Sequence, residues 1–209
     1  MSKGAKIGCG AAVVIGIIVI VLFSFFKNTY NQLVIKDEAV NNGWAQVENV
    51  LQRRMDLIPN LVETVKGYAN FERETLEAVI QARANATRTQ INADQLMDNP
   101  EQLTQYLEAQ NGLSSALARL MVVVERYPEL KANQNFLRLQ DELAGTENRI
   151  AVERRRFNET VRDYNLNVRR FPVNLIAGLL GFPQRPYFEA PPEAEQAPQV
   201  DFSGMGGTN

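Results

Sequence analysis

A long apolar run near the N-terminus constrains this chain more than any other feature. Ile7 to Phe26 reads IGCGAAVVIGIIVIVLFSFF, with no charged residue and no proline. As an α-helix rising ~1.5 Å per residue, this run would be ~30 Å long, which is the thickness of the hydrocarbon core of a bilayer. We therefore predict a short N-terminal tail over residues 1–6 and a transmembrane helix over residues 7–26, followed by one soluble domain.

A cleaved secretory signal is the alternative for this run, with Lys3 and Lys6 as its basic start. The run is long for the apolar part of such a signal, and no A-x-A-like cleavage site follows it. Aromatic residues and Lys27 follow instead, which suits a membrane–water interface. Cys9 does not mark a lipoprotein, because it precedes most of the apolar run and Lys6 stands where an aliphatic residue is needed. We predict an uncleaved anchor.

The basic residues that flank the run favour one orientation by a small margin. Lys3, Lys6 and the terminal amine lie on one side, and Lys27 and Lys36 lie on the other. Because Lys and Arg close to a span favour the cytoplasmic side, the short tail is expected inside and the domain outside the cytoplasm. The single cysteine lies within the run, so the domain forms no internal disulfide. That fits either compartment.

The complete absence of histidine excludes several catalytic and metal-binding arrangements at once. Ser-His-Asp triads, Cys-His pairs and HExxH zinc sites all need histidine, and so do the Glu-x-x-His ligands of di-iron bundles. The net charge of −2 and the lack of a basic stripe argue against nucleic-acid binding. The one basic run, Arg154 to Arg156, is interpreted as a solvated helix face.

Apolar residues spaced by three and four predict a helix from Thr29 to about Leu57. Asp37 falls on the same line, whereas Gln52, Arg53 and Arg54 fall off it. Pro59 disfavours helix in the preceding residue and lacks an N–H donor, so a second helix is expected to begin there and to run to about Ile91. One long helix kinked at Pro59 remains the alternative. The predicted buried face of the first helix consists of Leu33, Val40, Trp44, Val47, Leu51, Met55 and Ile58.

Two further helices follow a turn-like segment. The segment Asn92–Pro100 is expected to be a loop in which Asp94 and Asp98 take part in turns and caps, not in a calcium site. Helices are predicted from Glu101 to Arg126 and from Asn133 to Arg170, again from three–four spacing. The fold class is therefore all-α, an up-and-down four-helix bundle of long antiparallel helices over residues 28–182, behind the N-terminal transmembrane helix.

The end of the bundle carries a second apolar segment, Phe171–Phe182, which is too short to span a bilayer. With four helices, this segment returns to the membrane end, where Arg169 and Arg170 suit anionic headgroups. The alternative is that it only caps the bundle core. The final stretch, 183–209, is rich in Pro and Gly, has one Arg against four acidic residues, and is predicted to be a disordered acidic tail. The membrane-interface candidates are Arg169, Arg170, Phe171, Leu175, Ile176, Leu179, Leu180 and Phe182.

Several motifs resemble the bacterial LemA family, and the resemblance covers nearly the whole chain except the acidic tail. They are YNQLV at 30–34, LQRRMDLIPNLVETVKGY at 51–68, FNETVRDYN at 157–165, and FPVNLIAGLLGF at 171–182 followed by PYFE. The resemblance implies an up-and-down four-helix bundle behind a membrane segment, in the bacterial inner (cytoplasmic) membrane. One relative is associated with magnetosome membranes, and the resemblance supplies no catalytic residues.

The leading function predicted from the sequence is a non-enzymatic, membrane-anchored scaffold or adaptor. Its partners would be membrane lipid and unidentified proteins, with no nucleic acid and no cofactor or metal, and a homo-oligomer is compatible with the sequence. The alternative is a sensor or adaptor subunit of a membrane enzyme such as a protease, recruited by the acidic tail. An enzyme that uses Arg53, Arg54, Asp56 and Asn60 is a third hypothesis, against which we interpret these residues as salt bridges and caps at a helix turn.

Overall fold

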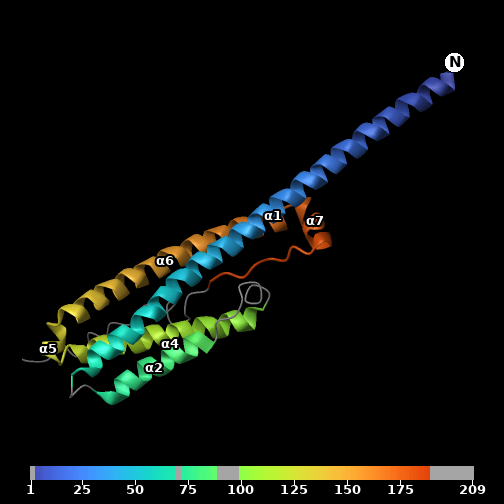
Figure 1. Cartoon of the computed structure of the whole chain (residues 1–209). Coiled ribbons are helices and arrows are strands. Elements are labelled where there is room, and N and C mark those ends of the chain that lie inside the picture. Colours follow the sequence, from blue (N-terminus) through green and yellow to red (C-terminus); the bar gives the residue numbers. More distant parts are fainter. Residues whose placement is uncertain (1–2, 69–71, 89–98, 189–209) are drawn as a thin grey trace, which may run out of the picture.

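The computed structural model describes residues 3–68, 72–88 and 99–188. Its regular structure is all helical within these ranges: α1 (Lys3–Lys66), α2 (Arg73–Arg88), α4 (Pro100–Val124), α5 (Pro128–Lys131), α6 (Gln134–Arg169) and α7 (Val173–Leu180). The all-α prediction is confirmed. Figure 1 shows the N-terminal part of α1 projecting beyond a bundle formed by the other helices and the rest of α1.

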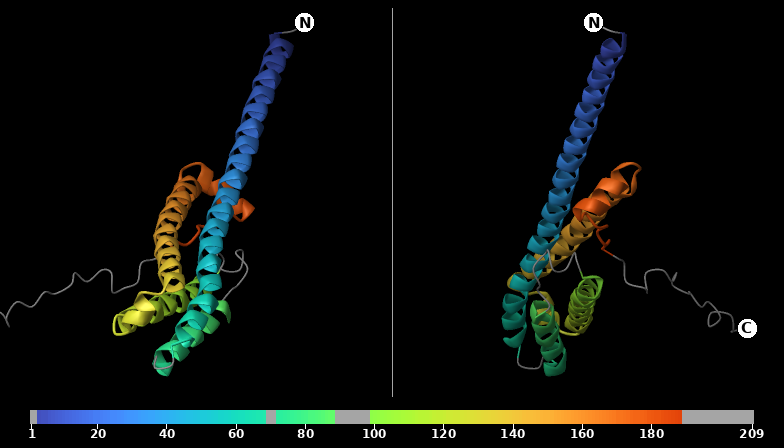
Figure 2. Two further views of the ribbon diagram at one scale, coloured as in Figure 1. Left: turned by 60° about the vertical axis from the view of Figure 1, so that its left-hand side comes forward. Right: turned by 90° about the vertical axis from the view of Figure 1, so that its right-hand side faces the viewer.

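Two helix pairs form the bundle. The long α1 and α6 pack along each other, and the shorter α2 and α4 pack together against the end of the bundle farthest from the N-terminus (Figure 2). Successive long helices run antiparallel. The predicted up-and-down arrangement is therefore correct, with two long and two short helices in place of four of equal length.

The buried faces agree with the predicted three–four spacing. All seven residues predicted for the first helix face are buried, and so is the face predicted for the last helix, from Phe136 to Val168. The core divides into a cluster near the projecting part of α1, around Trp44 and Phe157, and a distal cluster around Leu61 and Leu120. Asn99 and Asn133 cap α4 and α6, because their side-chain oxygens accept backbone N–H groups of the first turn.

The predicted break at Pro59 is wrong, since α1 continues through this proline and ends at Lys66. Pro59 provides no N–H for the carbonyl of Met55, one turn earlier. Arg83 Nε of α2 donates to that carbonyl instead, at 3.0 Å, so the missing bond is replaced by a contact between helices. The chain turns only after Gly67, and α2 begins at Arg73, so the single rod from Thr29 to Ile91 is also wrong.

The predicted start of the disordered tail at Pro183 is wrong, because the segment from Pro183 to Phe188 is ordered against the bundle. This segment, called the strap below, follows an extended path along α6, and Phe188 is buried in the core cluster around Trp44 and Phe157. The predicted disorder of 189–209 and the predicted loop aspartates, Asp94 and Asp98, lie outside the described residues.

Candidate membrane interface

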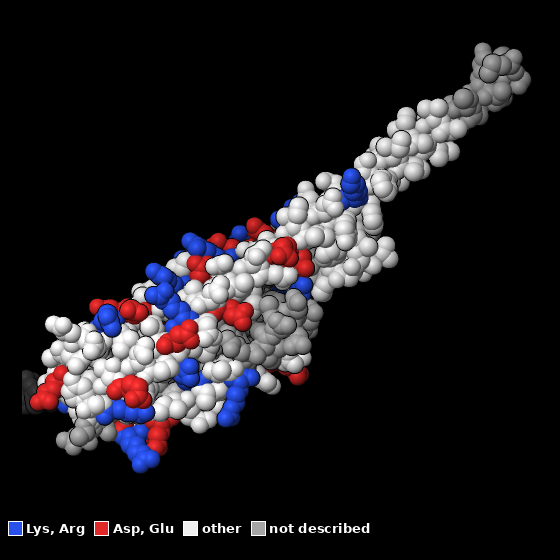
Figure 3. Space-filling model, viewed as in Figure 1, with Lys and Arg blue, Asp and Glu red and all other residues white. Residues whose placement is uncertain are grey.

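The projecting part of α1 is the one helix in the described ranges that is long and apolar enough to cross a membrane. Its large apolar side chains, from Val13 to Phe23, are exposed to solvent in the isolated chain. Figure 3 shows charged side chains spread over the bundle but an uncharged surface along this projection. Exposure of this much apolar surface is unfavourable in water and favourable in lipid.

The C-terminal apolar segment lies beside the base of this projection, as the four-helix topology predicts. After α6 ends at Arg169, the chain turns and forms α7, which packs on both α6 and α1. Phe182 completes the attachment, with its ring 6.0 Å from that of Tyr30 in an edge-on contact. Gly181 ends α7 at a φ of 73°, a left-handed conformation that glycine adopts without steric cost.

The eight interface candidates separate into exposed and half-buried residues. Arg169 and Arg170 are exposed, and the side chains of Phe171, Leu175 and Leu179 are 76%, 65% and 79% exposed. Ile176, Leu180 and Phe182 are half-buried, and Ala177, which was not a candidate, is the residue that α7 buries. The segment therefore caps the core with one face while it leaves a large apolar face unpartnered among the described residues.

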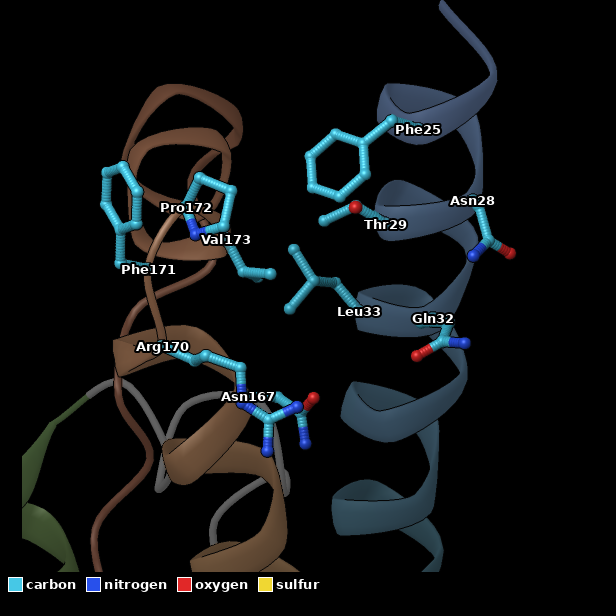
Figure 4. Close-up of a pocket in the computed structure, with 10 residues that line it drawn as sticks. All are labelled: Phe25, Asn28, Thr29, Gln32, Leu33, Asn167, Arg170, Phe171, Pro172 and Val173. Carbon is cyan, nitrogen blue, oxygen red and sulfur yellow. The ribbon is translucent and has the colours of Figure 1, made fainter. Parts of the chain in front are cut away.

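A cleft of about 250 Å³ opens between α1 and the start of α7. Phe25, Thr29 and Leu33 on α1 face Pro172 and Val173 across it, and Arg170 and Asn167 lie at one end (Figure 4). The lining is half apolar and half polar, since Asn28, Thr29, Gln32, Asn167 and Arg170 contribute to it. The cleft lies directly after the apolar run, where a bilayer interface would be.

A polar cluster around Arg54, in the middle of the bundle, tests the hypothesis that Arg53, Arg54, Asp56 and Asn60 form an active site. Arg54 is 0% exposed, although the spacing analysis placed it off the buried face. Its Nη1 donates to Ser114 Oγ and Glu147 Oε1, both at 2.7 Å, and its Nη2 donates to the backbone and side-chain oxygens of Gln110. Arg53, Asp56 and Asn60, its proposed partners, are exposed, so the four residues do not converge on one site.

Two side chains near Arg54, those of Tyr106 and Arg154, have shifted pKa values. Burial, and then the charge of Glu48, raise the pKa of Tyr106 to about 12. Burial, and then the nearby charge of Arg54, lower the pKa of Arg154 to about 10. Arg154 is therefore not part of a solvated face as predicted, because its guanidinium lies over the ring of Phe188, 4.1 Å from the centroid. At pH 7, Tyr106 is therefore neutral and Arg154 is positively charged, as they would be in water. This indicates that the cluster has a structural role.

The contacts of the strap were not predicted from the sequence. Arg185 pairs with Asp37, and the side chains of Asn158 and Asn165 bond to the strap backbone. Two signals could have revealed them: a carboxylate on an otherwise apolar line of α1, and two asparagines seven residues, or two turns, apart on one helix.

These features define a class, a helical bundle built on a helix able to enter a membrane, with a second apolar segment at its base. The chain belongs to the LemA family, whose model matches residues 43–202. The match covers residues 43–66 of α1, the rest of the bundle, α7 and the strap.

The chain is also similar to individual members of this group. It is 26% identical over 201 residues to magnetosome protein MamQ 2 of Paramagnetospirillum magneticum, which covers 88% of this chain and 74% of that protein. It is 24% identical over 175 residues to protein LemA of Metamycoplasma hominis, which covers 83% of this chain and 75% of that protein.

Proposed function

We propose that this protein is a non-enzymatic scaffold or adaptor that touches one membrane twice, through the apolar part of α1 and through Arg169–Phe182. The observation that carries the proposal is the exposed face of α7, which lies beside the end of the apolar run. The apolar part of α1 and the exposed apolar face of α7 are far apart in the sequence but lie at the same end of the bundle. The similarity to a protein named for the magnetosome supports a role in organising membrane.

The two arginines fit the second contact. Arg169 and Arg170 immediately precede the apolar face of α7, and neither forms an ion pair within the part of the chain that the structure describes. Basic side chains next to an inserted apolar face gain about 1 kcal/mol each from anionic lipid. Leu175 and Leu179 lie four residues apart, on the same side of α7, and would enter the acyl region together.

The test is the depth of α7 in a bilayer. The full chain carries a fluorescent probe at Leu179 and is reconstituted in vesicles that contain brominated lipids. Quenching by bromine on the acyl chain is the expected result. The matched control is a probe at Ile80, an exposed apolar residue on α2 in the distal half of the bundle. Equal quenching at Leu179 and Ile80 would show that α7 only caps the core.

A further inference from the structure

The strap lies against α1 and α6 in the manner of a bound peptide. The surface that it covers is called the groove below and consists of Asp37, Trp44, Arg154, Asn158, Tyr164 and Asn165. Asn165 Nδ2 donates to the Arg185 carbonyl at 2.8 Å, and its Oδ1 accepts the Arg185 N–H at 2.9 Å. Asn158 holds Phe188 in the same way, at 2.9 and 2.8 Å. Each side-chain amide thus pairs with both backbone groups of one residue, as a neighbouring β-strand would.

Two side chains add sequence preference to these backbone contacts. Arg185 donates from Nε and Nη2 to the Asp37 carboxylate, with an ion-pair distance of 3.0 Å. Phe188 is 6% exposed, with its ring 6.2 Å from that of Trp44 and beneath Arg154. The groove therefore recognises an extended segment that carries Arg and, three residues later, an aromatic side chain.

These contacts come from α1 and α6 and do not depend on how the strap is joined to the rest of its chain. Tyr164 of α6 supplies a further bond, donating from its hydroxyl to the Pro183 carbonyl at 2.8 Å. Only Gly181 and Phe182 connect the strap to α7, and Phe182 is itself held at the end of α7, where its N–H donates to the Ala177 carbonyl at 3.0 Å, so the strap can separate from α7 after Phe182. The strap can thus leave its groove with α7 in place.

We propose that the groove also binds the strap of a second copy, so that neighbouring chains exchange straps and assemble. The second copy is the occupant favoured here because it carries the same Arg185 and Phe188 that the groove accommodates. This inference rests on the proposed membrane anchoring and gives the scaffold its partner.

Anchoring in one membrane makes the exchange geometrically accessible. Copies held by the same apolar run present their grooves at the same height above the bilayer. An extended chain covers at most ~3.5 Å per residue, so the stretch from Leu180 to Phe188 reaches ~28 Å. A neighbour must therefore bring its groove within ~28 Å, a little less than three helix diameters of ~10 Å.

Surface density should control the exchange. The contacts of an exchanged strap equal those it makes within one chain, so no new interface energy is needed. The intrachain strap is favoured by its short connection, and a neighbour competes only when its local concentration is high. Confinement to a membrane surface provides that concentration, and dilution in lipid should reverse the assembly.

The experiment pairs two full-length variants in the same vesicles. The first, Arg185→Ala/Phe188→Ala, has an intact groove and no ligand side chains. The second, Asn158→Ala/Asn165→Ala/Trp44→Phe, has an intact strap and a weakened groove. Trp44 is the only tryptophan of the sequence, so fluorescence reports on the groove of the first variant alone. We expect its emission to shift when Phe188 is lost and to return at least halfway toward the wild-type value as the second variant is added.

Three controls separate the outcomes. Circular dichroism establishes that both variants are folded, and vesicle flotation establishes anchoring, so that a failure of anchoring is distinguished from a failure of exchange. A partner that also carries Arg185→Ala/Phe188→Ala should restore nothing. Absence of recovery in floated vesicles at high density would overturn the proposal, and so would recovery with a soluble peptide of residues 183–190 but not with the second copy.

A second measurement avoids the disruptive variants. A photoreactive benzoylphenylalanine replaces Phe188 in two differently tagged, otherwise unaltered chains in one membrane. Exchange predicts crosslinks from position 188 of one chain to α1 or α6 of the other, with a yield that rises several-fold with surface density. Crosslinks that remain within one chain at every density would contradict it.

Discussion

The buried side chain of Arg54 links three helices through hydrogen bonds. Its guanidinium joins α1 to Gln110 and Ser114 of α4 and to Glu147 of α6. Removal of one partner of a buried polar cluster leaves the others unpaired, which costs more than the loss of an exposed contact.

We expect Arg54→Ala to lower the free energy of unfolding by about 1–3 kcal/mol, because the side-chain oxygen of Gln110 loses its donor inside the bundle. Its neighbour Arg53 is exposed, and Arg53→Ala should change stability by less than about 0.5 kcal/mol. Chemical denaturation of the full chain in detergent, followed by circular dichroism, measures both. Equal effects of the two substitutions would contradict the structural role of Arg54.

Tyr106 should make the free energy of unfolding fall as the pH rises in the alkaline range. Its pKa is raised to about 12 by burial, against about 10 in an unfolded chain. Between these values the unfolded chain has lost the phenolic proton and the folded chain has kept it. The stability from this group is thus complete below pH 10 and is lost as the pH rises toward 12.

The prediction is that Tyr106→Phe flattens this alkaline decline. The shift of about two pKa units corresponds to about 2–3 kcal/mol, so the wild type should lose that much more stability than the variant between pH 9 and pH 12. Denaturation at several pH values measures the difference. Parallel pH profiles for the two proteins would show that the phenol is not buried as described.

Spacing alone did not reveal the burial of Arg54, for a reason that concerns the bundle geometry. A single stripe describes a helix with one neighbour, whereas α1 contacts α6 on one side and α2 and α7 on others. Arg54 follows Leu51 by three and precedes Ile58 by four, so it lies on the widened buried surface. Composition could not show this, because arginine is buried only when its partners are present.

At the scale of helices, Pro59 shows why a strong sequence signal was misinterpreted. The rule that proline ends a helix assumes that the carbonyl one turn earlier has no other donor. Arg83 is that donor here, and it comes from a helix more than twenty residues further along the chain. The boundaries of α4 and α6 were predicted within two residues, because their caps and breakers are local in sequence.

We predict energetic coupling between Pro59 and Arg83. In the Pro59→Ala background the Met55 carbonyl regains an intrahelical N–H donor, so Arg83→Ala should cost less there than in the wild type. A double-mutant cycle on unfolding free energies should give a coupling of about 1 kcal/mol. Strictly additive effects would mean that the Arg83 bond does not replace the missing one.

At the scale of the whole molecule, the sequence predicted the return of the C-terminal apolar segment to the base of the projection. That prediction depended only on an even number of bundle helices, because each helix reverses the direction of the chain. It is therefore unaffected by the first turn, which was predicted at Pro59 and lies after Gly67. The strap was missed because its low hydrophobicity is typical of disorder. It is ordered by side chains of α1 and α6, which composition within the segment does not reveal.

Orientation across the membrane provides a prediction at the same scale. Because basic residues favour the short N-terminal tail inside, we expect the bundle on the non-cytoplasmic face. In a Cys9→Ser background, an Ile80→Cys chain should react with a membrane-impermeant maleimide in intact spheroplasts, whereas Ile18→Cys in the apolar run should not. Labelling of position 80 only after lysis would place the bundle inside.

One feature of α1 connects the bilayer to the far end of the molecule: the helix has no break from its apolar part to Lys66. The part beyond Asn28 is about 57 Å long at 1.5 Å per residue. A lever of that length would convert a tilt of about 10° in the lipid into a displacement of about 10 Å at its tip. Since α6 and α7 are packed along this lever, the bundle of a chain anchored as proposed would move as one arm when the bilayer changes thickness.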